Sequence, residues 1–528
     1  MRVLLLIGLL LVLALPFAWR QREAVGLVDE TLVIITPHNG AIRHEFGRAF
    51  ERWYRARTGR RLRVDWRIVG GTGDIVRYLE STYAAVFARV WTAAGGEWNA
   101  AVQAGLQNPA TGPAAPPAVW AARRAFLASE TSCGIDVFFG GDTYQASREA
   151  ASGRFVDAGL TRRHPDWFTD RDIPRRHRGA VFWDEGGRWF GTALSSYGIL
   201  YNRVNLAGLG HVPEPRTWSD LASPRLLGQV GLANPAKSGS VCEAFEAMIQ
   251  QQIAARVAGG VDATPDEAVR AGWAAGLQLI QRLAANARYF TDASQKPPLD
   301  VANGDCAAGL CIDFYGRQQQ EAVRARGDQE RIGYTTPTGG SAATADPIGL
   351  LRGAPNRQAA ELFLEFVLSP AGQRIWGLKV GAPGGPERYA LRRMPIRADF
   401  YADEAARHRG DPEDDPYGDD ATAFVYRPEW TGDLFREIGF VTRVLGMDNH
   451  DALVEAWREI QAAPPERRAA ALAVLQNVDR LSYERTREEI RPRLNAKDRV
   501  EEVRLATELN AHFRAQYQRA ARIARGRE

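Results

Sequence analysis

TLVIITPHNG, residues 31–40, joins a run of apolar and β-branched residues to a turn of small and polar ones. An amphipathic helical stretch follows to about residue 57. The same order returns in LRVDWRIV, residues 62–69, which GGTG and a second helical stretch follow. A repeated strand, turn and helix predicts parallel strands whose turns gather at one edge of a sheet. Ligands of open α/β sheets bind at that edge.

Later segments extend this pattern into a second lobe. IDVFF, residues 135–139, is a predicted strand, and GTALSSYGILYN, residues 191–202, is long enough to cross from one lobe to another. We therefore expect lobe 1 over residues 31–192, with a helical insertion at about 81–131. Lobe 2 is predicted over 193–340 and a return to lobe 1 over 341–400. Residues 401–528 predict a helical C-terminal extension that begins with an acidic, solvated linker at 411–420.

Composition and the first residues indicate an exported protein of more than one domain. A chain of 528 residues exceeds one ordinary core. Its 67 basic and 63 acidic residues nearly cancel, which gives no reason to expect nucleic acid as a partner. Residues 3–18 are apolar and follow Arg2. Residues 1–22 are therefore either a cleaved signal peptide or a retained anchor in contact with the inner membrane, and the predicted location is the periplasm.

The four cysteines leave two interpretations open. Cys306 and Cys311 are close in sequence, whereas Cys133 and Cys242 are far apart. In an oxidising compartment these residues can form one or two disulfides of undetermined connectivity. Buried free thiols are the alternative, and the spacing fits no zinc pattern.

From residue 31 to about 401 the chain resembles the type 2 periplasmic solute-binding proteins of ABC importers, in the family-1 branch that includes ferric-iron binders. The resemblance rests on ordered landmarks: His38-Asn39 after the first strand, then IDVFFGGD, GILYN, PRTWSDL, GDCAAGLCIDFYGR, LFLEFVLSPAGQRIW and RMPIR. It implies an α/β, two-lobed type 2 periplasmic binding fold with hinge strands that closes around a small oxygen-rich ligand. It also implies a permease and an ATPase as partners.

The same resemblance implies a candidate metal site. Ferric binders of this branch use two consecutive tyrosines with a histidine and a carboxylate, because a hard cation prefers anionic oxygen. Here the tyrosine pair reads Phe314-Tyr315, so the first phenolate is missing, and Asp313 could supply an oxygen instead. His38 and Asp142 fall near the other two positions. The candidate metal ligands are thus His38, Asp142, Asp313 and Tyr315, with Fe³⁺ as transported ligand rather than resident cofactor.

An organic or phosphorylated anion is the rival ligand. The turns at 70–73, 140–142 and 237–240 place backbone N–H groups at predicted helix starts, which attract phosphate or carboxylate. Lys237 adds a counter-charge, and hydroxyl groups add donors. The candidate ligand-binding residues are Thr36, His38, Asn39, Gly71, Thr72, Gly141, Asp142, Ser195, Ser196, Lys237, Ser238, Gly239, Asp313 and Tyr315. Each also has a purely structural interpretation as a turn, cap or core residue.

Two other functional classes remain open at the level of sequence. An exported enzyme is disfavoured because the chain contains no H-E-x-x-H, no G-x-S-x-G and no H-x-E with a paired C-x-x-C. A sensory ectodomain would suit a retained N-terminal anchor, but no signalling module follows the predicted fold. We therefore expect a binding protein rather than a catalyst.

Overall fold

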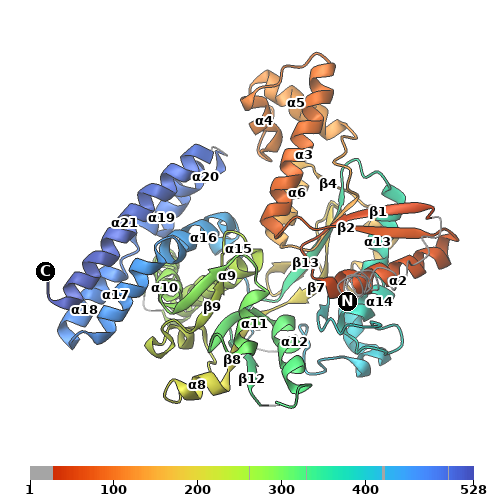
Figure 1. Cartoon of the computed structure of the whole chain (residues 1–528). Helices are drawn as coiled ribbons and strands as arrows, with labels where there is room; N and C mark the ends of the chain where they lie inside the picture. The colour runs from red at the N-terminus through yellow and green to blue at the C-terminus, as the bar shows by residue number, and fades with distance from the viewer. Residues whose placement is uncertain (1–27, 261, 329, 419–422, 497–498, 528) are drawn as a thin grey trace, which may run out of the picture.

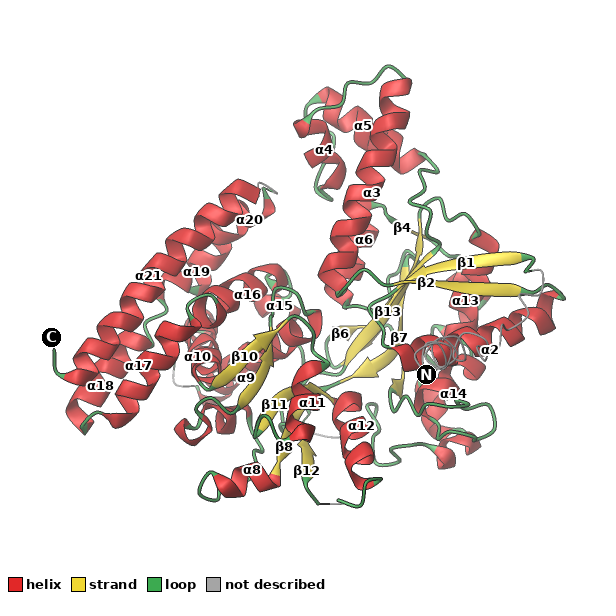
Figure 2. Ribbon diagram, viewed as in Figure 1, coloured by secondary structure: helices red, strands yellow, loops and turns green. Residues whose placement is uncertain are grey.

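The computed structural model describes residues 28–527, apart from 261, 329, 419–422 and 497–498. The predicted signal peptide or anchor, residues 1–22, lies outside the described part of the chain. Within that part, none of the helices has both the length and the apolar character that a membrane crossing requires. Two separate sheets form the centres of two lobes, as the resemblance implied (Figure 2).

Lobe 1 is built on a mixed sheet with strand order β14-β7-β13-β3-β1-β2, and β4 pairs with β13. β1 runs parallel to β2 and β3, whereas β13 runs antiparallel to β3 and β7. Alternation along β1 sends Leu32 and Ile34 into one apolar core and Ile35 into the core on the other face. The strands are β1 (Glu30–Ile35), β2 (Leu62–Arg67), β3 (Val137–Phe139), β4 (Phe155–Val156), β7 (Trp189–Ser195), β13 (Thr344–Leu351) and β14 (Met394–Pro395).

Helices cover both faces of this sheet, and three of them form an arm. The arm consists of α3, α4 and α5, which extend away from the sheet at the top of Figure 1. Buried Tyr83, Phe87 and Phe126 hold it together, with ring centroids 5.5–5.9 Å apart. The helices of lobe 1 are α2 (Gly40–Thr58), α3 (Thr72–Ala93), α4 (Ala100–Gln107), α5 (Pro117–Ala128), α6 (Thr143–Ser152), α7 (Leu160–Arg163), α13 (Arg357–Leu368) and α14 (Pro370–Gly377). A small ribbon pairs β5 (Arg176–His177) with β6 (Ala180–Val181).

Lobe 2 contains a five-stranded sheet of order β10-β9-β11-β8-β12. β9, β10 and β11 are parallel, and β8 runs antiparallel to β11 and β12. The strands are β8 (Tyr197–Asn202), β9 (Val230–Ala233), β10 (Ala287–Thr291), β11 (Ala308–Ile312) and β12 (Ile332–Thr335). The helices are α8 (Arg203–Gly208), α9 (Gly239–Gly259), α10 (Pro265–Ala285), α11 (Lys296–Asn303) and α12 (Asp313–Arg324).

Two chain crossings lie side by side between the lobes. β7 ends in lobe 1 at Ser195, and β8 begins in lobe 2 at Tyr197. The return crossing enters β13 at Thr344, which pairs with Ser195 across the sheet. The Tyr197 N–H donates to the Ser341 hydroxyl over 2.7 Å, which ties the two crossings together. Paired crossings of this kind permit a hinge motion of one lobe against the other.

The C-terminal extension is helical and flanks lobe 2 (Figure 1). It shares one apolar core with that lobe: the Trp273 indole donates to Leu481 O over 2.8 Å, and Tyr517 is fully buried. Two short π-helical turns, Arg443–Met447 and Thr486–Ile490, interrupt it. Its α-helices are α15 (Pro428–Thr431), α16 (Phe435–Thr442), α17 (His450–Ala462), α18 (Pro465–Leu475), α19 (Tyr483–Arg485), α20 (Arg491–Asn495) and α21 (Arg499–Arg525).

Two further expectations meet the structure in the loops and cysteines. The described part of the acidic stretch, 411–418, is not a free linker, because Asp411 pairs with Arg392 and Asp414 lies 2.6 Å from Arg317 of α12. It therefore straps lobe 1 to lobe 2. All four cysteines are buried free thiols, so the disulfide interpretation is not the one the structure adopts.

Candidate functional site

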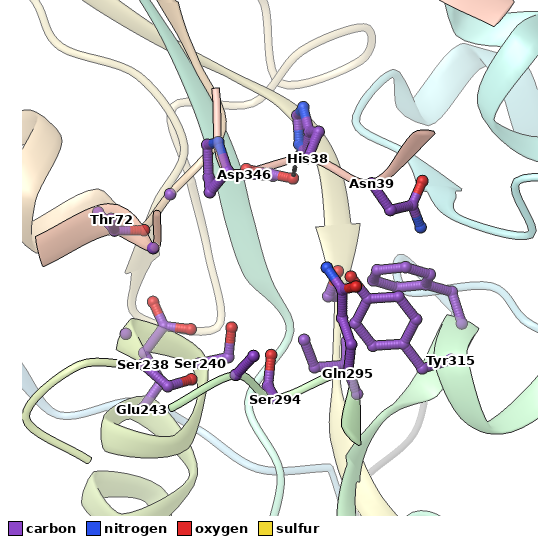
Figure 3. Close-up of a pocket in the computed structure, with 18 of the residues that line it drawn as sticks. His38, Asn39, Thr72, Ser238, Ser240, Glu243, Ser294, Gln295, Tyr315 and Asp346 are labelled. Atoms are coloured by element: carbon purple, nitrogen blue, oxygen red, sulfur yellow. Dashed lines mark hydrogen bonds and ion pairs between the residues drawn. The ribbon is translucent and has the colours of Figure 1, made fainter. Parts of the chain in front are cut away.

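A cleft of about 510 Å³ lies between the two lobes, where the turns after the strands meet. Figure 3 shows His38, Asn39, Thr72 and Asp346 on one side of it and Ser238, Glu243, Gln295 and Tyr315 on the other. The first group belongs to lobe 1 and the second to lobe 2. The cleft therefore lies where the sequence predicted a ligand site, at the edge where the turns after the strands gather.

Among the helices that begin at this cleft, α2, α3 and α9 each follow a short residue at the capping position. Asn39 Oδ1 accepts from the Ile42 N–H at the start of α2 over 3.1 Å, and Ser238 Oγ accepts from the Val241 N–H of α9 over 3.4 Å. Gly71 precedes α3, and its own N–H donates to Asp74 over 3.2 Å. The first turn of a helix has N–H groups without intrahelical partners and a partial positive charge. The cleft thus receives backbone donors from both lobes.

The lobes approach each other closely beside these helix starts. A Cβ added at Gly71 would lie 3.1 Å from the carbonyl oxygen of Lys237, across the cleft. A Cβ added at Gly239 would overlap the Asp142 carboxylate of lobe 1. A Cβ would be tight at Gly71 and would displace Asp142 at Gly239, so both glycines favour the close approach of the lobes that corresponds to a closed arrangement.

A buried ionic network forms the lobe 1 wall of the cleft. His38 Nε2 lies 2.8 Å from Asp346 Oδ2, and Arg393 contacts the same oxygen. Arg393 also donates to the Ser195 hydroxyl over 2.6 Å. His38, Asp346 and Arg393 are only 8%, 7% and 5% exposed. Burial alone would raise the pKa of Asp346, but Arg393 and His38 together hold it at about 2.

Within the described part of the chain, three buried polar atoms of this network have no hydrogen-bond partner: His38 Nδ1, Asp346 Oδ1 and Arg393 Nε. Buried polar groups are normally paired, so these atoms are available to a bound ligand or to ordered water. The Arg393 guanidinium also packs on rings from both lobes, 4.7 Å from the centroid of Phe314 and 5.2 Å from that of Trp376. Its position therefore depends on lobe closure.

Asp346 and Arg393 were absent from the sequence prediction. A lone carboxylate in the apolar run ADPIGLL, residues 345–351, and an arginine beside the Met-Pro edge strand were the available signals. Both residues are charged where the surrounding pattern is buried, and buried charges are rarely left unpaired.

The lobe 2 side combines a cation with carboxylates and hydroxyls. Lys237 Nζ lies 2.7 Å from Asp292, and both side chains remain substantially exposed. Glu243 Oε2 accepts from the Thr344 hydroxyl over 3.0 Å and from the Tyr197 phenol. Burial raises the pKa of Glu243 well above its ordinary value, and the neighbouring Asp142 charge adds to this effect. The lobe 2 side of the cleft therefore carries a basic group together with carboxyl groups.

Tyr315 faces the cleft from the start of α12. Burial is the main cause that raises the pKa of its phenol far above the ordinary value. Asn39 of lobe 1 and Gln295 of lobe 2 lie close to the same hydroxyl (Figure 3). The phenol therefore acts as a neutral hydrogen-bonding group in this environment.

Ten of the predicted ligand-binding residues line the cleft, and four do not. Ser195 and Ser196 are neighbours in an extended segment, so they face opposite sides and only Ser195 reaches the cleft. Thr36 is fully buried, and its hydroxyl accepts from the His38 N–H over 3.1 Å. Those in the cleft are His38, Asn39, Gly71, Thr72, Gly141, Ser195, Lys237, Ser238, Gly239 and Tyr315.

The predicted metal ligands are not brought together. Asp142 caps α6 by accepting from the Gln145 N–H over 2.8 Å, and it lines a neighbouring groove. Asp313 is fully buried and lies 3.7 Å from Arg317. Only His38 and Tyr315 of the four reach the cleft. In the described residues no group of three or more His, Cys, Asp or Glu side chains is arranged to hold a metal ion.

One family model and several known proteins are similar to parts of this chain. Residues 135–400, half of the chain, match the family described as bacterial extracellular solute-binding protein. An uncharacterized Haemophilus influenzae protein is 24% identical over 240 residues, which are 46% of this chain and 60% of that relative. The phosphoglycerate transport regulatory protein PgtC of Salmonella typhimurium is 25% identical over 184 residues, 35% of this chain and 39% of PgtC. The chain thus matches less than two thirds of either relative's length.

Two solved structures are similar at low identity. The periplasmic binding protein AfuA of Actinobacillus pleuropneumoniae, with fructose-6-phosphate bound, has 18% identity and a TM-score of 0.48 over 81% of this chain and 98% of AfuA. Iron-bound HitA of Pseudomonas aeruginosa has 16% identity and a TM-score of 0.46 over 79% of this chain and 99% of HitA.

Proposed function

Because the chain belongs to the bacterial extracellular solute-binding protein family, we propose that it captures a phosphorylated, hydroxyl-bearing organic anion between its lobes. It then delivers that anion to the permease and ATPase of an ABC importer. The observation that carries the proposal is the meeting of three helix starts, those of α2, α3 and α9, at one cleft between the lobes.

The anionic group of the ligand lies at these helix starts. Free N–H groups and the helix dipole favour phosphate or carboxylate at such positions. Lys237 stands beside the start of α9, and Arg43 lines the same cleft from α2. Donors from both lobes on one anion stabilise the closed arrangement, because an open protein can offer only half of them.

The remaining lining groups favour hydroxyls on the same molecule. Glu243, Asp292 and Gln295 offer acceptors on lobe 2, and Ser240 and Ser294 add hydroxyls. Hydroxyl groups of the ligand can donate to these carboxylates while its phosphate lies at the helix starts, so a ligand with both kinds of group satisfies both sides of the cleft. This chemistry agrees with the curated relative PgtC, whose name refers to phosphoglycerate transport.

Ferric iron is the less favoured ligand. An iron site would require Tyr315 to lose its proton, and burial in this cleft opposes that loss. The neighbouring position is Phe314, which packs against Arg393 instead of offering oxygen.

The proposed location is the periplasm, with residues 1–22 serving as signal peptide or as inner-membrane anchor. The binding role is non-enzymatic. A sensory role would use the same cleft, and gene deletion separates the two: loss of ligand uptake indicates transport, whereas retained uptake with lost regulation indicates sensing.

A ligand panel tests the proposal. Phosphoglycerate and a hexose phosphate are compared with their unphosphorylated parents and with ferric salt by thermal unfolding. We expect only the phosphorylated members to stabilise the protein, by about 2.7 kcal/mol at a hundredfold excess over the dissociation constant. Lys237→Ala should weaken binding by about tenfold, whereas the exposed Lys379→Ala serves as the matched control. Stabilisation by ferric salt alone, with a tyrosinate absorption band, would contradict the proposal.

A further inference from the structure

A second cavity, of about 350 Å³, lies between α6 of lobe 1, α9 of lobe 2 and the start of the C-terminal extension. Glu243, Thr344 and Ala345 line both this cavity and the cleft, so the two spaces share one wall. The residues that give the second cavity its chemistry are Tyr144, Trp189, Glu243, Glu246, Tyr426 and Phe435.

Two glutamates in this cavity each use only one carboxylate oxygen. Glu246 is 5% exposed, and its Oε1 accepts from the Tyr426 phenol over 2.9 Å and the Thr431 hydroxyl over 2.6 Å. Glu243 accepts from Thr344 and Tyr197 on Oε2 alone. In the described part of the chain, Glu246 Oε2 and Glu243 Oε1 therefore have no partner. Glu246 as a residue is almost fully buried, and a buried carboxylate needs donors to offset its desolvation.

Of the described residues that line the second cavity, none is Lys, Arg or His. Asp433 also lines it, but this carboxylate already pairs with Arg487 at 3.1 Å and with Arg491. The Asp142 carboxylate lies close enough to Glu246 to raise its pKa, after the larger effect of burial. Glu246 and Glu243 therefore lack a basic partner among the described residues that line this cavity.

Aromatic rings form the rest of the lining. The rings of Tyr144 and Phe435 lie 4.9 Å apart between centroids and join lobe 1 to the extension. Trp189 and Tyr426 contribute two more rings. Aromatic faces attract cations through their quadrupole, and the attraction is larger where water is excluded. The wall formed by residues 426–435 lies C-terminal to the matched family region, so the cavity depends on the extension.

We propose that this second cavity binds a small organic cation of the ammonium class, with its charged nitrogen beside Glu246 and Glu243 and its alkyl groups against the four rings. The occupant bridges lobe 1, lobe 2 and the extension, and it therefore favours the closed arrangement. This site is separate from the proposed anion cleft and does not depend on the identity of the anion.

Choline and its uncharged analogue, in which carbon replaces nitrogen, test the proposal by calorimetry on the full chain. The two probes have the same shape and differ in charge. We expect choline to bind about tenfold or more tightly than the analogue, and Glu246→Gln to abolish that preference. Phe435→Leu should weaken choline binding without removing the charge preference. Equal binding of both probes, or no binding of choline to the wild-type chain, would overturn the proposal.

Two controls separate this proposal from the anion proposal. Lys237→Ala should keep the wild-type affinity for choline, and Phe435→Leu should keep the wild-type affinity for the phosphorylated anion. If Glu246→Gln does not fold, the probe pair and Phe435→Leu still decide the outcome. Tighter choline binding in Lys237→Ala, from loss of a repelling charge, would place the cation in the cleft instead and refute a separate site.

Discussion

The interlobe cleft and the second cavity share Glu243 but offer opposite chemistry on its two sides. The cleft has helix starts, Lys237 and the buried Arg393, which favour an anion. The second cavity has two half-paired carboxylates among aromatic rings, which favour a cation. Because both spaces lie between the same lobes, closure of the lobes can depend on two ligands of opposite charge. The unpaired atoms of each wall, rather than overall composition, determine which ligand it accepts.

Loss of the Arg393 charge in the cleft should have the largest effect on stability. Arg393→Gln leaves the Asp346 carboxylate buried with His38 as its remaining partner, so unfolding free energy should fall by about 3–5 kcal/mol. Urea unfolding measures the loss. The double variant Arg393→Gln with Asp346→Asn removes both charges and should recover most of the stability. A double variant as unstable as the single one would show that Arg393 acts through packing on Phe314 and Trp376 instead.

Two buried carboxyl groups should give a smaller effect, a dependence of stability on pH. Burial raises the pKa of Asp142 and of Glu246 to about 7. The folded protein therefore holds these protons more tightly than the unfolded chain, whose carboxyls titrate near roughly pH 4. Stability should be greatest below that pH window, fall as pH rises from about 4 to about 7, and level off above it.

Glu246→Gln should remove part of this pH-dependent loss. The unfolding free energy that is recovered is about 1.4 kcal/mol for each unit by which the pKa of Glu246 differs between the folded and unfolded protein. Chemical unfolding at a series of pH values measures it, and the exposed Glu466→Gln is the matched control. Asp346 acts in the opposite direction, since its pKa of about 2 contributes stability that is lost as pH falls from about 4 to about 2. An unchanged slope in Glu246→Gln would contradict the assignment of a titrating carboxyl to the second cavity.

The sequence predicted the cleft where the chemistry is local to one turn. A strand, a small-residue turn and a helix place His38, Asn39, Gly71 and Lys237 at a sheet edge by geometry alone. The pairing of Asp346 with Arg393 joins residues 47 positions apart, and it follows from the sheet register rather than from spacing. The contact of Glu246 with Tyr426 spans 180 positions.

Two other differences have simple physical reasons. Successive side chains of an extended segment point to opposite sides, so Ser195 faces the cleft and Ser196 does not. Because both residues are serine, residue type alone could not tell which of them reaches the cleft. The extension was predicted as helical, but its common core with lobe 2 and its wall of the second cavity depend on tertiary packing. The sequence therefore predicted the two-lobed fold and residues on both sides of the cleft, whereas the buried pair Asp346 and Arg393 required the structure.

Native mass spectrometry of the protein purified from its own host would identify the ligand that the cleft carries. We predict a bound organic anion with a phosphate group. Excess phosphorylated competitor should displace this anion, and Lys237→Ala should not retain it. A bound iron ion with a visible absorption band that disappears in Tyr315→Phe would contradict it.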